Sequence, residues 1–270
     1  MTHTPTAQQA VLIAAIQRVL EADPRIAALW LAGSLGGGGG DAFSDVDMLV
    51  LCEDGKIAET AAHYVKGVAA IAAPILINPL FGGRIVNVVT KDWQRFDLVF
   101  VEAESLPRYN ANELTPLFNR GTHGPPRDQR PPHRTDPAAL RKTVQEFLRI
   151  FGTAAVVYGR GEHLVTQTGI GMLRGLVIEL MLEENGLGPA ERGGALHLNT
   201  LLTGDQRRAL EALPSAAANR ESLLAANRAL AALFFPRARA LAAKIGMDWP
   251  QALEDATRVH LKKADLDFGF

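Results

Sequence analysis

The chain has 270 residues, of which 47% are hydrophobic and 21% charged, and its formal net charge is −1. This composition is typical of a folded globular protein and argues against a mostly disordered chain. The near-zero net charge argues against non-specific electrostatic binding of nucleic acid. The single cysteine, Cys52, excludes an intramolecular disulfide and a cysteine-based zinc site. The length predicts one large or two modest domains.

The first 122 residues alternate between helical and strand-like patterns. Ala7–Glu21 places apolar residues at the spacing of an amphipathic helix, and the Asp23-Pro24 pair ends it. A second helix is predicted at 57–71. Short apolar runs predict strands at Ile26–Ala32, Val46–Cys52, 74–81, 84–90, 96–101 and 114–119, and the runs at 84–90 and 96–101 are close enough to form a hairpin. These patterns predict an α+β unit with a mixed β-sheet.

The second half of the chain has a different texture and follows a linker. Residues 121–137 contain five prolines and two glycines, which predicts a connector. Helical spacing then predicts helices at 137–158, 162–185, 205–212, 219–245 and 250–264, and Pro236 is expected to kink or divide the fourth. We therefore expect a domain at 1–122 with net charge −4, a Pro/Arg-rich linker at 123–137, and an α-helical bundle domain at 138–270 with net charge +2.

The most informative stretch is LWLAGSLGGGGGDAFSDVDMLVL, residues 29–51. Asp45 and Asp47 open an apolar run, and residues two apart on a strand point to the same face. Two carboxylates on one face repel each other unless a cation lies between them. Oxygen ligands favour Mg²⁺, which typically keeps waters and substrate phosphates as its other ligands. The pair therefore predicts a metal site for a phosphate-bearing substrate.

Two further features fit the same site. Gly33-Ser34 ends the preceding strand, where glycine allows a phosphate close to the backbone and the Ser34 hydroxyl can hydrogen-bond its oxygens. Asp97 lies inside the apolar run FDLVFV, where a lone acid is costly unless it is paired, hydrogen-bonded or near a metal. We expect Asp97 either to complete a two-metal site or to act as general base on an attacking hydroxyl.

The sequence GSLGGGGGDAFSDVD, with Asp97 on a later strand, resembles the polymerase-β-type nucleotidyltransferase superfamily. Within it, the sequence resembles the lincosamide and aminoglycoside nucleotidyltransferases, where a GS-x5-GD-x2-SD-x-[DE] arrangement recurs. The resemblance implies that Asp45 and Asp47 bind Mg²⁺ and that Gly33 and Ser34 hold the nucleotide phosphates. It implies that Asp97 is the third acid, as metal ligand or general base. The five consecutive glycines depart from the pattern, because these enzymes usually begin a helix after the GS pair.

Other residues are weaker candidates. The run Arg160-Gly161-Glu162 resembles the start of the second helix in the lincosamide enzymes, so Arg160, Glu162 and Arg174 are candidates for binding the acceptor substrate. Arg84, Lys91 and Arg95 could neutralise phosphate charge near Asp97, but we expect them at the solvated surface. Trp93 and Phe96 could stack on a base, but we expect them in the core. Glu179, Glu183 and Glu184 are expected on a solvated face, although a cationic aminoglycoside would favour such a surface.

Together these features predict a Mg²⁺-dependent nucleotidyltransferase. It would move a nucleoside monophosphate from an NTP, with ATP as the expected donor, to a hydroxyl of a small molecule and release pyrophosphate. A lincosamide or aminoglycoside acceptor would make it an antibiotic-resistance enzyme. We expect a cytoplasmic monomer or homodimer with no membrane or nucleic-acid partner, because no signal peptide and no run of ~20 apolar residues is visible. The alternatives are a non-catalytic nucleotide-binding or antitoxin-like module of the same fold, and nucleotidyl transfer to RNA or protein.

Overall fold

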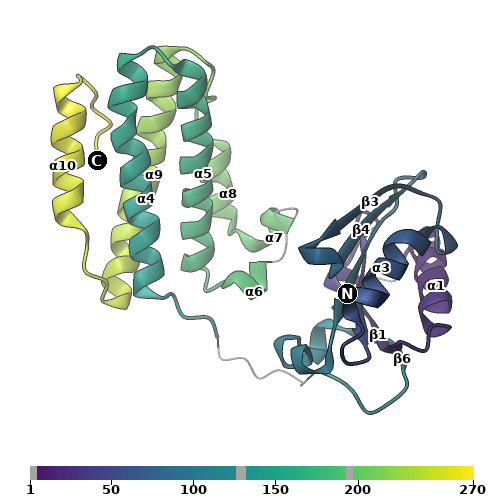
Figure 1. Cartoon of the computed structure of the whole chain (residues 1–270). Helices are drawn as coiled ribbons and strands as arrows, with labels where there is room; N and C mark the ends of the chain where they lie inside the picture. Colours follow the sequence, from purple (N-terminus) through teal and green to yellow (C-terminus); the bar gives the residue numbers. More distant parts are fainter. Residues whose placement is uncertain (1–4, 126–131, 193–196) are drawn as a thin grey trace. The chain divides into compact units, whose positions relative to one another are not determined.

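The computed structural model describes residues 5–125, 132–192 and 197–270. The chain divides into two compact units, Met1–Arg130 and Pro131–Phe270, and the division falls inside the stretch 123–137 that the sequence marks as a linker. The first unit holds a mixed six-stranded sheet, and the second is built from helices (Figure 1). The fold class expected from the sequence is therefore confirmed.

The first unit is organised around its sheet. The strands are β1 (Ile26–Ala32), β2 (Val46–Cys52), β3 (Pro74–Leu80), β4 (Ile85–Thr90), β5 (Arg95–Val101) and β6 (Thr115–Asn119). Their order is β3-β4-β5-β2-β1-β6. The central pair, β2 and β5, runs parallel, and the other neighbours in this sheet run antiparallel. The predicted hairpin is the β4–β5 pair.

Two helices cover one face of this sheet (Figure 1). The helices of this unit are α1 (Ala7–Glu21), the single turn α2 (Gly33–Gly36) and α3 (Ile57–Gly67). Thr6 caps the start of helix α1, where the side chains of Thr6 and Gln9 each accept a hydrogen bond from the other's backbone N–H. The buried side chains of α1 and α3 form one core with those β2 residues whose side chains alternate toward them, Val46, Met48 and Val50.

The opposite face of the sheet is less uniformly apolar. Trp30, Leu49 and Leu51 form a small buried cluster there with Leu106, a residue of the 3₁₀ segment Ala103–Arg108. By strand alternation, Asp47 lies on the same face as Leu49 and Leu51. This face therefore carries an apolar cluster toward one end of β2 and an acid at the other.

Over residues 132–192 and 197–270, the second unit is a bundle of four long helices with three short ones. Its helices are α4 (Pro137–Gly159), α5 (His163–Glu184), α6 (Pro189–Arg192), α7 (Leu198–Leu201), α8 (Gly204–Glu211), α9 (Arg220–Ile245) and α10 (Gln251–Lys263). Phenylalanines hold the core together, since the rings of Phe147 and Phe234 stack with centroids 3.7 Å apart and Phe235 meets Phe147 edge to face.

Pro236 was expected to kink or divide its helix, and the expectation of a division is wrong. Helix α9 runs from Arg220 to Ile245 with Pro236 in its interior. The neighbouring Phe234 and Phe235 are fully buried against Phe147. The packing of these rings stabilises a continuous helix although proline lacks the N–H that one hydrogen bond of the helix requires.

Helix α5 is long and apolar enough to cross a membrane by the criteria of length and composition. Its residues Leu173, Val177 and Leu180 are buried in the bundle core, and the charged Arg174 lies in its middle. We interpret α5 as a core helix of this unit.

Candidate active site

Two of the predicted acids lie side by side. Asp47 on β2 pairs with Asp97 on β5, so both side chains emerge on the sheet face away from α1 and α3. Asn87 on β4 pairs with Asp97 in turn, and its Nδ2 donates to Asp97 Oδ2 at 2.7 Å. On β3, Asn78 pairs with Asn87 and its Nδ2 lies 3.4 Å from Asn87 Oδ1. A polar row of Asn78, Asn87, Asp97 and Asp47 therefore crosses four strands.

The third predicted acid lies beside this row. Asp45 directly precedes β2, and Arg95 Nη1 lies 3.7 Å from its Oδ2. Arg95 Nη2 also donates to the carbonyl oxygen of Phe43 at 3.2 Å. Sequence reasoning favoured a solvated surface role for Arg95. The structure leaves the Arg95 side chain 38% exposed and also places its guanidinium beside Asp45.

The pKa values of Asp47 and Asp97 are raised above their ordinary range. Burial raises the pKa of Asp47 to about 6, and the negative charges of Asp45 and Asp97 contribute to the rise, while Arg95 opposes it. Burial also raises the pKa of Asp97, against the hydrogen bond from Asn87, which lowers it. The site therefore contains more negative charge than Arg95 neutralises, which is typical of a place that receives a cation.

Position 33 requires glycine because the Asp47 carboxylate lies very close to its backbone. The φ angle of Gly33 is +59°, and a β-carbon there would lie 1.9 Å from Asp47 Oδ2. Gly33 also begins α2 directly after β1. The backbone of this turn therefore lies against the Asp47 carboxylate with no side chain between them.

The glycine tract that follows is explained in part by packing. A β-carbon at Gly36 would lie 2.2 Å from the carbonyl oxygen of Leu31, and one at Gly40 would lie 2.5 Å from Cδ2 of Leu35. Consecutive glycines are unfavourable in a helix, and α2 ends after a single turn at Gly36.

Ser34 is connected to the loop that leads to Asp45. Its Oγ donates to Ser44 Oγ at 2.9 Å, and Ser44 Oγ in turn donates to Asp41 Oδ1 at 3.1 Å. The buried side chain of Gln9 donates from Nε2 to the backbone carbonyls of Asp41 and Ser44, both at 2.9 Å. These bonds fix the loop between Ser34 and helix α1.

The donor set can be tested for its fit to a metal ion. Within residues 5–125, 132–192 and 197–270, no three His, Cys, Asp or Glu side chains form a cluster that could hold one. The carboxylates of Asp45 and Asp47 are nevertheless hard oxygen donors in a site with excess negative charge. Mg²⁺ commonly binds one or two carboxylates and completes its shell with water and substrate phosphates. The residues fit an ion that is held partly by substrate.

The three candidate acceptor-binding residues of the helical unit do not all lie together. Arg160 follows α4 and Glu162 precedes α5, so these two are neighbours in the turn between the helices. Arg174 lies about 18 Å further along the axis of α5, at 1.5 Å per residue. All three are exposed. The structure therefore brings Arg160 and Glu162 together and leaves Arg174 apart from them.

The acidic pair near the end of α5 is not the solvated face that the sequence suggested. His133 Nε2 lies 2.9 Å from Glu183 Oε2, and Arg192 also contacts Glu183. Arg237 Nη1 donates to Glu184 Oε2 at 2.7 Å. Because both acids are half-buried and paired within their own unit, they stabilise the bundle rather than offer an open acidic surface.

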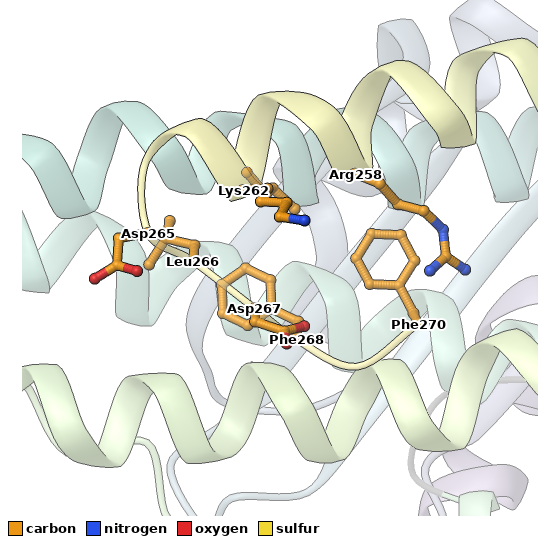
Figure 2. A pocket seen from close by; sticks show the side chains of 8 residues that line it. Arg258, Lys262, Asp265, Leu266, Asp267, Phe268 and Phe270 are labelled. Atoms are coloured by element: carbon orange, nitrogen blue, oxygen red, sulfur yellow. The ribbon is translucent and has the colours of Figure 1, made fainter.

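A cavity of about 470 Å³ lies elsewhere in the helical unit, between α10 and the last residues of the chain (Figure 2). The guanidinium of Arg258 lies over the ring of Phe270, 4.7 Å from its centroid. The ring of Phe270 also stacks on Phe235 of the bundle core. Since its lining includes none of the sequence candidates, this cavity is separate from the predicted site.

Sequence reasoning missed several residues. Asn87 could have been found from the alternation of β4, which puts this polar side chain among Ile85, Val89 and other partly buried positions. Trp93 was expected in the core with Phe96, but Phe96 is buried and Trp93 is 74% exposed. The position of Trp93 in the tight turn between β4 and β5 was the available signal.

The chain has matches among solved structures. No protein-family model matches the chain, and no curated protein matches it. The chain is similar to the crystal structure of an aminoglycoside 6-adenyltransferase from Bacillus subtilis, with 13% sequence identity and a TM-score of 0.44. The match covers 96% of this chain and 98% of that chain.

Proposed function

We propose that the chain is a Mg²⁺-dependent nucleotidyltransferase that moves a nucleoside monophosphate from an NTP to a hydroxyl of a small molecule and releases pyrophosphate. The observation that carries the proposal is the group formed by Asp45, Asp47 and Asp97 at the start of two adjacent parallel strands, against the bare backbone of Gly33. Partly buried acids of like charge destabilise a fold. Binding a cation and phosphates would explain why they are there.

The residues take distinct roles in this proposal. Asp45 and Asp47 would hold Mg²⁺, with Asp97 as a further ligand or as the general base. When bound, the cation would offset the charge of the phosphates and of the departing pyrophosphate. The backbone N–H groups near Gly33 and the hydroxyl of Ser34 would hold phosphate oxygens, because the turn α2 lies against Asp47.

In the proposed reaction the acceptor hydroxyl oxygen attacks the α-phosphorus. A new P–O bond forms while the bond to the pyrophosphate oxygen breaks, and the hydroxyl proton passes to Asp97. Asn87 donates to Asp97 Oδ2 and thereby leaves Oδ1 to accept this proton. The raised pKa of Asp97 favours this role, because a base is most effective when its pKa approaches the working pH.

The finer parts of the proposal concern the substrates and the setting. ATP is the expected donor, and a lincosamide or aminoglycoside is the expected class of acceptor, for which Arg160, Glu162 and Arg174 remain the binding candidates. The domain limits of 1–122 and 138–270 also remain part of the proposal. We expect the protein to act in the cytoplasm as a monomer or homodimer.

The decisive experiment is a pyrophosphate-release screen of the full chain with four NTPs, Mg²⁺ and a panel of hydroxyl-bearing antibiotics. A product heavier by one nucleoside monophosphate supports the proposal. Asp47→Asn should abolish its formation, and Asp97→Asn should lower kcat more than nucleotide affinity. Asp54→Asn, an exposed acid beyond the far end of β2, is the matched control and should leave turnover unchanged. Nucleotide binding without any pyrophosphate release would instead favour the non-catalytic alternative.

A further inference from the structure

A second cavity of about 230 Å³ lies beside the acids in the first unit. It is lined by the beginning of α1, the loop 42–44 and the turn between β4 and β5, which contains Trp93. Two of its lining residues also border the acidic site. Arg95 reaches Asp45, and Ser44 accepts a hydrogen bond from Ser34. The cavity and the site of the proposed chemistry are therefore adjacent.

Two aromatic side chains of this cavity are largely exposed. Phe43 is 87% exposed and Trp93 is 74% exposed, although both line the same hollow. Single exposed apolar residues are common and need no explanation, but two rings at one cavity beside an arginine form a surface that suits a flat, polarisable ligand.

The backbone at Trp93 gives an independent reason to assign it a role. Its φ angle is +57°, the left-handed conformation. The turn is closed by the N–H of Thr90, which donates to the carbonyl of Gln94, and by the N–H of Trp93, which donates to the carbonyl of Thr90. Turns of this kind favour glycine or asparagine at the left-handed position. An exposed tryptophan there serves neither the core nor the turn, which points to a ligand.

We propose that this cavity binds the base of the nucleotide, with the ring of Trp93 stacked on it and Phe43 beside it. This inference rests on the proposed function. The volume is below the ~300 Å³ at which pockets for drug-sized ligands begin, so it suits one planar ring system rather than a whole nucleotide or a multi-ring antibiotic.

The hydrogen bond between Ser34 and Ser44 favours the nucleotide over the acceptor as the occupant of this cavity. The cavity is lined by Leu12 of α1 and by Val46, whose side chain faces the core under α1. Asp47 and Asp97 both emerge on the opposite face of the sheet, so the face alone does not separate the nucleotide from the acceptor. Ser44, on the cavity side, is bonded to Ser34, the residue proposed to hold phosphate.

The test compares two ligands that differ in the base. The affinity of the full chain for Mg²⁺–ATP and for Mg²⁺–tripolyphosphate is measured by calorimetry. Trp93→Gly should weaken ATP binding between about 5-fold and 100-fold, the range expected for loss of one base–aromatic stack. It should leave tripolyphosphate binding unchanged. Trp93→Phe keeps a ring and should retain most of the ATP affinity. Glycine also relieves the backbone, so the thermal midpoint of Trp93→Gly should stay the same or rise.

A matched control is available in the same unit. Phe81 is 77% exposed and has a φ of +50°, but it does not line this cavity. Phe81→Gly should therefore leave the affinity for ATP unchanged.

The outcomes separate the two proposals. Should the wild-type chain bind none of the four NTPs, the proposed function and this inference both fail. Should it bind ATP while Trp93→Gly binds ATP equally well, or loses ATP and tripolyphosphate affinity alike, the base site is wrong and the proposed function stands.

Discussion

Replacing Asp47 by asparagine should stabilise the protein while it abolishes transfer. Burial and neighbouring negative charge raise the pKa of Asp47 from 3.8 to about 6 in the folded state. One pKa unit corresponds to 1.36 kcal/mol, so the ionised carboxylate lowers the free energy of unfolding by up to roughly 3 kcal/mol above pH 6. Asparagine has nearly the same shape and carries no charge. The variant should therefore gain up to about this amount.

The sign of the effect depends on pH in a defined window. A folded-state pKa that is raised means that the folded protein binds the proton more tightly than the unfolded chain does. The stability associated with protonated Asp47 is thus complete below about pH 4 and is lost as pH rises through 6. Asp47→Asn and the wild type should have equal stability near pH 4 and diverge toward pH 8.

The assay is urea unfolding between pH 4 and pH 8 without divalent cations. The fluorescence of Trp30, a buried residue of the first unit, reports the transition. Asp54→Asn removes an exposed acid and should follow the wild-type profile at every pH. If the curves of Asp47→Asn and the wild type stay parallel over the whole range, the electrostatic account of the site is refuted.

Three further predictions concern the same structure. Gly33→Ala should cost about 1–3 kcal/mol of stability and most of the turnover, because its β-carbon would displace the Asp47 carboxylate; urea unfolding and pyrophosphate release measure the two effects. Asn87→Leu removes a donor that lowers the pKa of Asp97, so the acidic limb of the kcat/KM profile should move to higher pH. Pro236→Ala restores an N–H inside α9 at an exposed position and should raise stability by up to about 3 kcal/mol in urea unfolding.

Controls for these variants come from the same elements. Gly39→Ala adds a β-carbon with no atom within 4 Å and should leave turnover intact. Asn78→Ala removes an exposed amide one strand further from Asp97, so it should shift the pH profile far less than Asn87→Leu. An unchanged acidic limb in Asn87→Leu would contradict the role assigned to this residue.

The local elements could be predicted from sequence because their signals are local. The strand at Val46–Cys52 and the helix at Ala7–Glu21 follow from apolar periodicity and capping, and the structure has them at these bounds. The neighbourhood of Asp47 and Asp97 could only be proposed, because it depends on β2 lying parallel to β5 across an intervening helix and hairpin. No local sequence pattern indicates that β2 pairs with β5.

The residues whose roles were missed or misjudged depend on contacts that local sequence patterns do not describe. The register between neighbouring strands determines that Asn87 lies opposite Asp97. The contact of Arg95 with Asp45 likewise joins residues that are distant in the sequence. Gly36 is needed because its α-carbon lies against the carbonyl of Leu31, a contact that no composition rule contains. Pro236 was misjudged because the packing of the bundle outweighs an unfavourable local preference.

The polar row across the sheet has a consequence for how this chain can change over evolutionary time. The spacing of its members is set by the backbone ladder between strands, so loops outside the ladder can lengthen or shorten while the acids keep their places. A single residue inserted between Arg95 and Asp97 would displace the acid. It would turn the Asp97 side chain to the other face of the sheet, into the hydrophobic core under α1. The polar row is therefore tolerant of insertions and deletions in the connections and intolerant of even one inside β5.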